Sequence, residues 1–196
     1  MKKISRKYLA LMEAARELFW KHGFRRVSVE EVCHKALVSK MTFYRYFPNK
    51  MELAKAVYDK VADEGIENFK EIMADERTSP ADKMQQMLQM KLEGTNDISQ
   101  EFLKDFYSNP ELGLSAYVEE KSRLAWNEII RDFRHAQEKG WLRKDFKPEL
   151  FLIVTSKMSE MITDETLLKM YDSPQELVME LSRLFTFGIM PDREEK

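Results

Sequence analysis

Apolar residues recur every three or four positions along most of the chain, which is the period of an amphipathic helix. The first run places Leu9, Met12, Ala15 and Phe19 on one side of such a helix. Neither the alternating pattern of a strand nor a hairpin turn signal occurs. The pattern predicts an all-α chain of about nine helical stretches, at residues 3–22, 28–36, 40–47, 49–74, 80–93, 98–107, 111–139, 148–170 and 174–189. Gly23 predicts the end of the first stretch in the left-handed conformation.

Residues 28–47 have the layout of a helix-turn-helix. Ser28 and Glu31 predict a capping box at the start of the first short helix. Ser39 caps a second helix that stops before proline. Advancing 100° per residue along this second helix places Phe43 and Phe47 on one inward face. The outward positions, which are available to a partner, are Lys40, Met41, Thr42, Tyr44, Arg45 and Tyr46.

Charge is distributed unevenly along the chain, although its net value is only −2. Residues 1–50 contain 12 basic and 4 acidic residues, a balance of +8, and residues 51–196 contain 20 and 30, a balance of −10. A basic N-terminal quarter on an acidic body indicates that one end of the protein contacts a polyanion.

Three motifs between Ala14 and Leu53 match a known pattern. They are Ala-Ala…Leu-Phe…Gly-Phe, Ser-Val-Glu-Glu-Val, and Val-Ser-Lys-x-Thr-Phe-Tyr-Arg-Tyr-Phe-Pro-Asn-Lys. This stretch resembles the N-terminal DNA-binding domain of the TetR family of bacterial transcriptional regulators. The sequence departs from the family at Leu37, which replaces the usual turn glycine, and at Met41, where a small residue is frequent. A leucine held in a left-handed turn costs on the order of 1 kcal/mol.

The second short helix suits the major groove of DNA. Arg45 can pair with guanine, the methyl groups of Met41 and Thr42 can contact a thymine methyl, and tyrosine hydroxyls can reach phosphates. Lys50 adds a cation at the start of the next helix, where a phosphate could bind. The predicted DNA-binding residues are Ser28, Ser39, Lys40, Met41, Thr42, Tyr44, Arg45, Tyr46 and Lys50.

The resemblance implies a DNA-binding domain at residues 1–48 and a helical ligand-binding and dimerisation domain at residues 49–196. Two apolar stripes near the C-terminus could form a dimer interface or intrachain core; their candidate dimer residues are Leu150, Val154, Met158, Met161, Leu177, Leu181, Leu184 and Phe185. Candidate ligand-binding residues, which could equally pack as core, are Met87, Met90, Phe106 and Trp126.

Other classes of protein find little support in the sequence. The only cysteine, Cys33, excludes an internal disulfide and fits a reducing cytoplasm. The apolar runs are too short to span a membrane, and no apolar run follows the basic residues 2–7 as it does in a secretory signal. The three histidines lack metal-ligand spacing, and no phosphate-binding glycine loop or nucleophile elbow occurs. We therefore expect neither a metal site nor a cofactor.

These observations predict a cytoplasmic, homodimeric regulator that binds a double-stranded DNA operator with palindromic half-sites. The resemblance implies a repressor that a small-molecule effector releases. An activator, or a regulator without an effector, remains the alternative, followed by a small all-α enzyme or an interaction module without DNA affinity. The basic N-terminal quarter argues against the last two, because neither needs it.

Overall fold

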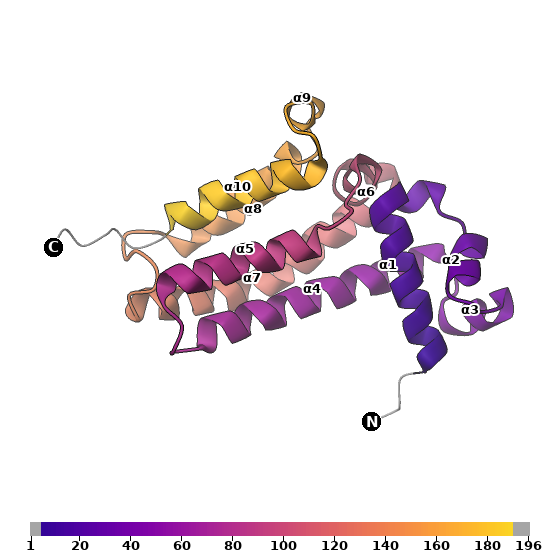
Figure 1. The fold of residues 1–196 in the computed structure, drawn as a ribbon, viewed down its shortest axis with the longest axis horizontal. Coiled ribbons are helices and arrows are strands. Elements are labelled where there is room, and N and C mark those ends of the chain that lie inside the picture. Colours follow the sequence, from indigo (N-terminus) through magenta and orange to yellow (C-terminus); the bar gives the residue numbers. More distant parts are fainter. Residues whose placement is uncertain (1–4, 190–196) are drawn as a thin grey trace. The chain divides into compact units, whose positions relative to one another are not determined.

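The computed structural model of the chain describes residues 5–189, except for the side chains of Trp126, Asn127 and Leu152. All regular elements in this part are helical, which confirms the all-α prediction (Figure 1). In chain order they are α1 (Arg6–Arg26), α2 (Val29–Lys35), α3 (Lys40–Tyr46), α4 (Lys50–Ala74), α5 (Pro80–Gly94), α6 (Gln100–Leu103), the π-helical turn η1 (Lys104–Ser108), the 3₁₀ turn η2 (Pro110–Leu112), α7 (Leu114–Glu138), α8 (Pro148–Met161), α9 (Glu165–Leu168) and α10 (Pro174–Gly188).

Most helix boundaries follow local signals in the sequence. Ser79 and Ser173 cap α5 and α10, each before a proline at the first helical position. The predicted stretch 148–170 is instead two helices, because the Asp164 carboxylate accepts the N–H groups of Thr166 and Leu167 and starts α9. The stretch 98–107 likewise becomes α6 followed by η1.

The first helix continues beyond its predicted end at residue 22. Gly23 breaks the helical geometry with φ 77° and ψ 164°, and the helix then resumes as far as Arg26. The positive φ agrees with the prediction, whereas this ψ value lies far from the left-handed helical region. A β-carbon at Gly23 would lie 2.8 Å from the β-carbon of Glu101 and 3.1 Å from its carbonyl carbon. The glycine therefore allows α6 to approach the backbone of α1 closely.

The described chain divides into two compact units. The first comprises the described residues up to Ala62 together with Asp97–Val118, and the second comprises Asp63–Asn96 and the described residues from Glu119 onward. The first unit is thus larger than the predicted DNA-binding domain 1–48, because α6, η1 and the first part of α4 pack with the N-terminal helices. The division at residue 48 between a DNA-binding domain and a ligand-binding and dimerisation domain stays a prediction.

Aromatic side chains form the centre of the first unit. Trp20 lies 4.2 Å from Phe102 between ring centroids, and Phe102 lies 4.4 Å from Phe106. Phe19 and Phe106 are fully buried beside them. These rings join α1 to α6 and η1, so distant parts of the sequence share one core.

The second unit has its own apolar core. Its buried residues are Met73, Met84, Phe133, Ala136, Leu142, Phe146 and Ile189. Phe151 on α8 lies 4.8 Å from Phe133 on α7 and 4.8 Å from Phe185 on α10. These contacts hold α7, α8 and α10 against one another.

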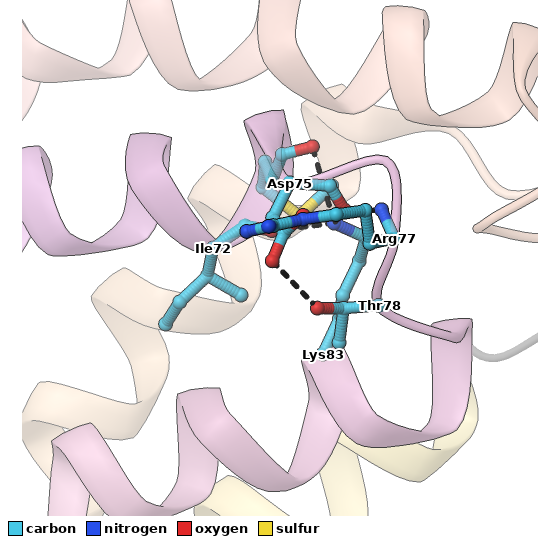
Figure 2. Close-up of polar contacts among 6 residues, drawn as sticks. Ile72, Asp75, Arg77, Thr78 and Lys83 are labelled. Atoms are coloured by element: carbon cyan, nitrogen blue, oxygen red, sulfur yellow. Dashed lines mark hydrogen bonds and ion pairs between the residues drawn. The ribbon is translucent and has the colours of Figure 1, made fainter.

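A buried lysine closes the end of α4 within the second unit (Figure 2). The ammonium of Lys83 donates to the carbonyl oxygens of Ile72 (2.5 Å) and Asp75 (2.6 Å) and lies 4.3 Å from the ring centroid of Trp141. Burial lowers the pKa of Lys83. The carboxylate of Asp75 faces Arg77 and Thr78 in the same turn. Lys83 thus supplies donors to carbonyls that have no partner within α4.

Candidate nucleic-acid interface

The helix-turn-helix begins with the predicted capping box. The hydroxyl oxygen of Ser28 accepts the Glu31 N–H (3.2 Å), and the Glu31 carboxylate accepts the Ser28 N–H (2.7 Å). The hydrogen bonds that the Glu31 carboxylate accepts from the N–H and the hydroxyl of Ser28 lower the pKa of Glu31. Ser39 caps α3 in the same way by accepting the N–H of Thr42 at 3.2 Å. Both serines therefore fix the starts of α2 and α3, and their contacts with DNA stay predictions.

The turn between α2 and α3 keeps left-handed geometry without a glycine. Leu37 has φ 54°, its N–H donates to the carbonyl of His34 (3.2 Å), and the Val38 N–H donates to Cys33 (3.0 Å). The side chain of Leu37 is 90% exposed. The turn thus has the strained left-handed geometry at Leu37, and these two backbone hydrogen bonds hold it.

Two phenylalanines anchor α3 to the rest of the first unit, as predicted. Phe43 and Phe47 are buried, and Phe47 stacks on Tyr8 of α1 with 5.3 Å between centroids. Tyr46 meets the same Tyr8 edge to face at 5.7 Å. The inward face of α3 therefore packs on α1, and the opposite face is open.

The outward face of α3 carries exposed side chains of the predicted kinds. Met41 and Tyr44 are 76% and 56% exposed. Arg45 is exposed, and within residues 5–189 its guanidinium has no ion pair or side-chain hydrogen bond. Lys40 forms an ion pair with Glu30 of α2, and that carboxylate raises the pKa of Lys40. Arg45 is thus the cation on α3 whose donors are open to a ligand.

Lys50 has a structural role that its sequence position did not predict. Its ammonium donates to the carbonyl oxygens of Phe24 (2.8 Å) and Val27 (2.7 Å) at the end of α1 and lies 4.2 Å from the Phe24 ring centroid. Burial lowers the pKa of Lys50. Because two carbonyls of α1 and its C-cap accept from this ammonium, Lys50 ties α4 to α1, and its contact with a phosphate stays a prediction.

The same end of α1 is held by α6 and η1. The Arg25 N–H donates to the buried carboxylate of Asp105 at 2.9 Å, and Arg26 pairs with Glu101 at 3.4 Å. Sequence reasoning missed Asp105, whose partner lies 80 residues away. The only local sign that the Asp105 carboxylate is buried is its position directly before Phe106. These contacts, with Lys50, fix the chain segment that leads into the helix-turn-helix.

The predicted ligand-binding residues are not gathered into one cluster by the described contacts. Phe106 is fully buried in the aromatic core of the first unit. Met87 packs against the core of the second unit, and Met90 lies partly buried on the same helix, α5. The side chain of Trp126 lies outside the described residues. The structure therefore gives Phe106 a packing role.

The predicted dimer residues separate into core and surface. Leu177 is buried, and Phe185 packs on Phe146 and Phe151 within the second unit. Leu150, Met161 and Leu184 are exposed, whereas Val154, Met158 and Leu181 are partly buried. Two further apolar side chains on the same helices, Ile153 and Phe187, are also exposed. Phe187 continues the helical period from Leu184, which is the signal that could have identified it.

Within residues 5–189, no group of histidine, cysteine and acidic side chains is arranged to hold a metal ion. None of the helices in this part of the chain is long and apolar enough to cross a membrane.

The two short helices and the open face of α3 have the arrangement of a DNA-binding helix-turn-helix. A sequence model described as "Bacterial regulatory proteins, tetR family" matches residues 11–57. This part of the chain is therefore similar to the DNA-binding part of TetR-family regulators.

Individual relatives agree with this assignment. The Transposon Tn10 TetC protein of Escherichia coli is 45% identical over 51 residues, which cover 26% of this chain and 26% of TetC. The HTH-type transcriptional regulator UidR of Escherichia coli K12 is 24% identical over 151 residues, 76% of this chain and 73% of UidR. The structure of FadR from Bacillus halodurans superposes with a TM-score of 0.67 at 21% identity and covers 95% of this chain and 98% of FadR.

Proposed function

We propose that the protein is a homodimeric repressor of transcription that binds a palindromic DNA operator and leaves it when a small molecule binds. The observation that carries the DNA-binding part is the open face of α3. Arg45 and Met41 lie opposite the buried Phe43, so the helix can enter a major groove without losing its packing on α1. The effector part rests on the family alone.

Exposed apolar residues on α8 and α10 support the homodimer. Ile153 on α8 and Leu184 on α10 are 62% and 66% exposed. The contact between Phe151 and Phe185 makes these two helices neighbours. Stable homodimer interfaces are richer in apolar surface than the remaining surface of a protein. A second copy of the chain would bury these side chains from water, and a two-fold axis would give each copy one DNA half-site.

Release by an effector would be a population shift. An effector that binds more tightly to one arrangement of the dimer favours that arrangement by the difference in binding free energy. Half-sites on one face of DNA lie about 34–36 Å apart, or at a multiple of that distance, so an arrangement with another spacing binds the operator weakly. The Lys50 cap makes the start of α4 and the end of α1 move together. A displacement of α4 would therefore carry the helix-turn-helix with it.

DNA binding can be tested with duplexes selected from a random pool. We expect selective binding. The logarithm of the association constant should fall linearly with the logarithm of salt concentration, with a slope of about −0.9 for each phosphate contacted. Arg45→Ala should weaken binding by about 1–3 kcal/mol and relax the preference at one base pair. Arg131→Ala, a change of an exposed arginine on α7, is the matched control and should bind as the wild type does. Absence of DNA binding at low salt would refute the function.

The dimer can be tested by analytical ultracentrifugation. We expect a species of about twice the chain mass of 23.3 kDa. The double change Ile153→Asp and Leu184→Asp should give folded monomers that lose affinity for the full palindrome, whereas Leu124→Asp on α7 should stay dimeric. A wild-type monomer at the concentrations used for DNA binding would contradict the proposal. The proposal also places the protein in the cytoplasm, where bacterial chromosomal DNA lies.

A further inference from the structure

We propose that Leu37 and Met41 recognise thymine methyl groups, so that the preferred half-site has thymines beside the guanine contacted by Arg45. This inference rests on the proposed DNA-binding function and specifies what that site recognises.

Leu37 and Met41 have the most exposed large apolar side chains in the described part of the chain, at 90% and 76%. A single exposed apolar residue is ordinary on a protein surface. Here the two extreme cases lie four residues apart on the element that contacts DNA. Their apolar surface makes almost no contribution to the packed core and is open to a partner.

Folding gives no reason for a leucine at position 37. The backbone there has φ 54°, a conformation that glycine adopts without strain and leucine does not. Strain of this kind is commonly retained at functional sites. Because the side chain is almost fully exposed, no contact within the described chain compensates for the strain. A contact made only in the DNA complex would account for it.

Met41 lies on the same face of α3 as Arg45. The two residues are four positions apart, which places them about 40° from each other around a helix, and the buried Phe43 and Phe47 lie on the other side. The N-terminal end of a recognition helix is the end that contacts base edges. Met41 is in the first turn of α3, and Leu37 is in the turn just before it. Both are therefore at the end of the helix that meets the bases.

Thymine presents the matching chemistry. Its 5-methyl group is the apolar group that bases offer in the major groove, and contacts with apolar side chains distinguish it from cytosine. The flexible side chain of methionine adapts its shape to such a group. Burial of one methyl group corresponds to about a fourfold change in affinity. Two contacted thymines in a half-site would thus contribute roughly 15-fold to its selection.

Deoxyuridine tests the inference directly, because it pairs as thymine does and lacks only the methyl group. The full chain is first used to select preferred duplexes from a random pool. Each thymine of the selected site is then replaced by deoxyuridine, and dissociation constants are measured for the wild type and for the double variant Leu37→Gly, Met41→Ala. Both changes suit the local backbone, since glycine accepts φ 54° and alanine favours a helix. Leu124→Ala, on an equally apolar exposed position of α7, is the control.

We expect deoxyuridine at one or two positions of a half-site to weaken wild-type binding by about fourfold each. The double variant should bind thymine and deoxyuridine duplexes equally, and Leu124→Ala should keep the wild-type difference. Selective binding with equal affinity for both bases would overturn the inference and leave the DNA-binding function intact. A penalty that persists in the double variant would assign the methyl contact to another residue, and it would also overturn the inference. Failure to select any duplex would overturn both proposals.

Discussion

Replacement of Gly23 by alanine is expected to destabilise the first unit strongly. The glycine has φ 77° and ψ 164°, a region that is essentially closed to other residues. The new β-carbon would lie 2.8 Å from the β-carbon of Glu101, 3.0 Å from a carboxylate oxygen of Asp105 and 3.1 Å from the Glu101 carbonyl carbon. One of these atoms belongs to the backbone of α6, so rotation of a side chain cannot relieve the overlap.

The magnitude follows from two contributions. Backbone strain of this type costs about 1–3 kcal/mol, and insertion of a methyl group into a packed contact costs about 1–3 kcal/mol. We therefore expect Gly23→Ala to lower the free energy of unfolding by roughly 2–6 kcal/mol. If α6 and the adjoining η1 move away instead, the hydrogen bond between the Arg25 N–H and the Asp105 carboxylate is lost, which costs about 1.5–3 kcal/mol.

Unfolding in guanidinium chloride, followed by circular dichroism, measures this change. Gly65→Ala is the matched control, because Gly65 lies inside α4 and an added β-carbon there meets no atom within 4 Å. Alanine at that position should raise stability by about 0.5–1 kcal/mol. A Gly23→Ala variant within about 0.5 kcal/mol of the wild type would refute the close approach of α1 and α6.

Three further predictions concern single polar side chains. Lys50→Met should lower the free energy of unfolding by about 2–3 kcal/mol, because two carbonyls at the end of α1 lose a charged donor. Thermal melting measures this loss of stability, and an unchanged melting temperature would contradict the capping role. Lys83→Met should cost about 2–6 kcal/mol in chemical denaturation, at about 1–3 kcal/mol for each of the two carbonyls that lose a charged donor. Gln86→Met, at an exposed position of the same helix, should change stability by less than about 0.5 kcal/mol. In the folded protein the pKa of Glu31 is lowered from its ordinary value of 4.5. As the pH falls below about that value, the unfolded chain binds more protons than the folded protein does. The stability that this carboxylate contributes is therefore lost as the pH falls through the lowered pKa. The denaturation midpoint of Glu31→Gln should consequently decline less than that of the wild type between about pH 5 and about pH 3, a range that contains the ordinary pKa. Equal declines would exclude a contribution from this carboxylate.

The helix-turn-helix could be predicted because its signals are local. Each cap is formed by residues three positions apart, as in the pair Ser28 and Glu31, and neighbouring backbone groups complete it. The burial of Phe43 and Phe47 follows from helical period alone. Asp164 is a local signal of the same kind, and its capping of α9 could have been predicted from the sequence.

The functional role of Lys50 could not be predicted in this way. Its position at the start of a helix suggested a phosphate contact, but its partners are carbonyls 23 and 26 residues earlier in the chain. The direction of a long, flexible side chain depends on which acceptors the folded chain brings near it. The same reason explains why Phe106 and Leu177, two apolar residues on amphipathic helices, became core instead of ligand or dimer contacts.

The sequence by itself determined the all-α fold, the caps of α2 and α3 and the residues that face outward from α3, because these depend on contacts within one or two helical turns. Only the tertiary structure decided that Lys50 caps α1, that Asp105 binds the Arg25 N–H, and that Leu37 keeps a strained turn with its side chain exposed. Such contacts join segments far apart in the chain, and many pairings satisfy the same apolar pattern. Close packing selects one of them, and that selection fixes which charged and apolar side chains remain open for DNA.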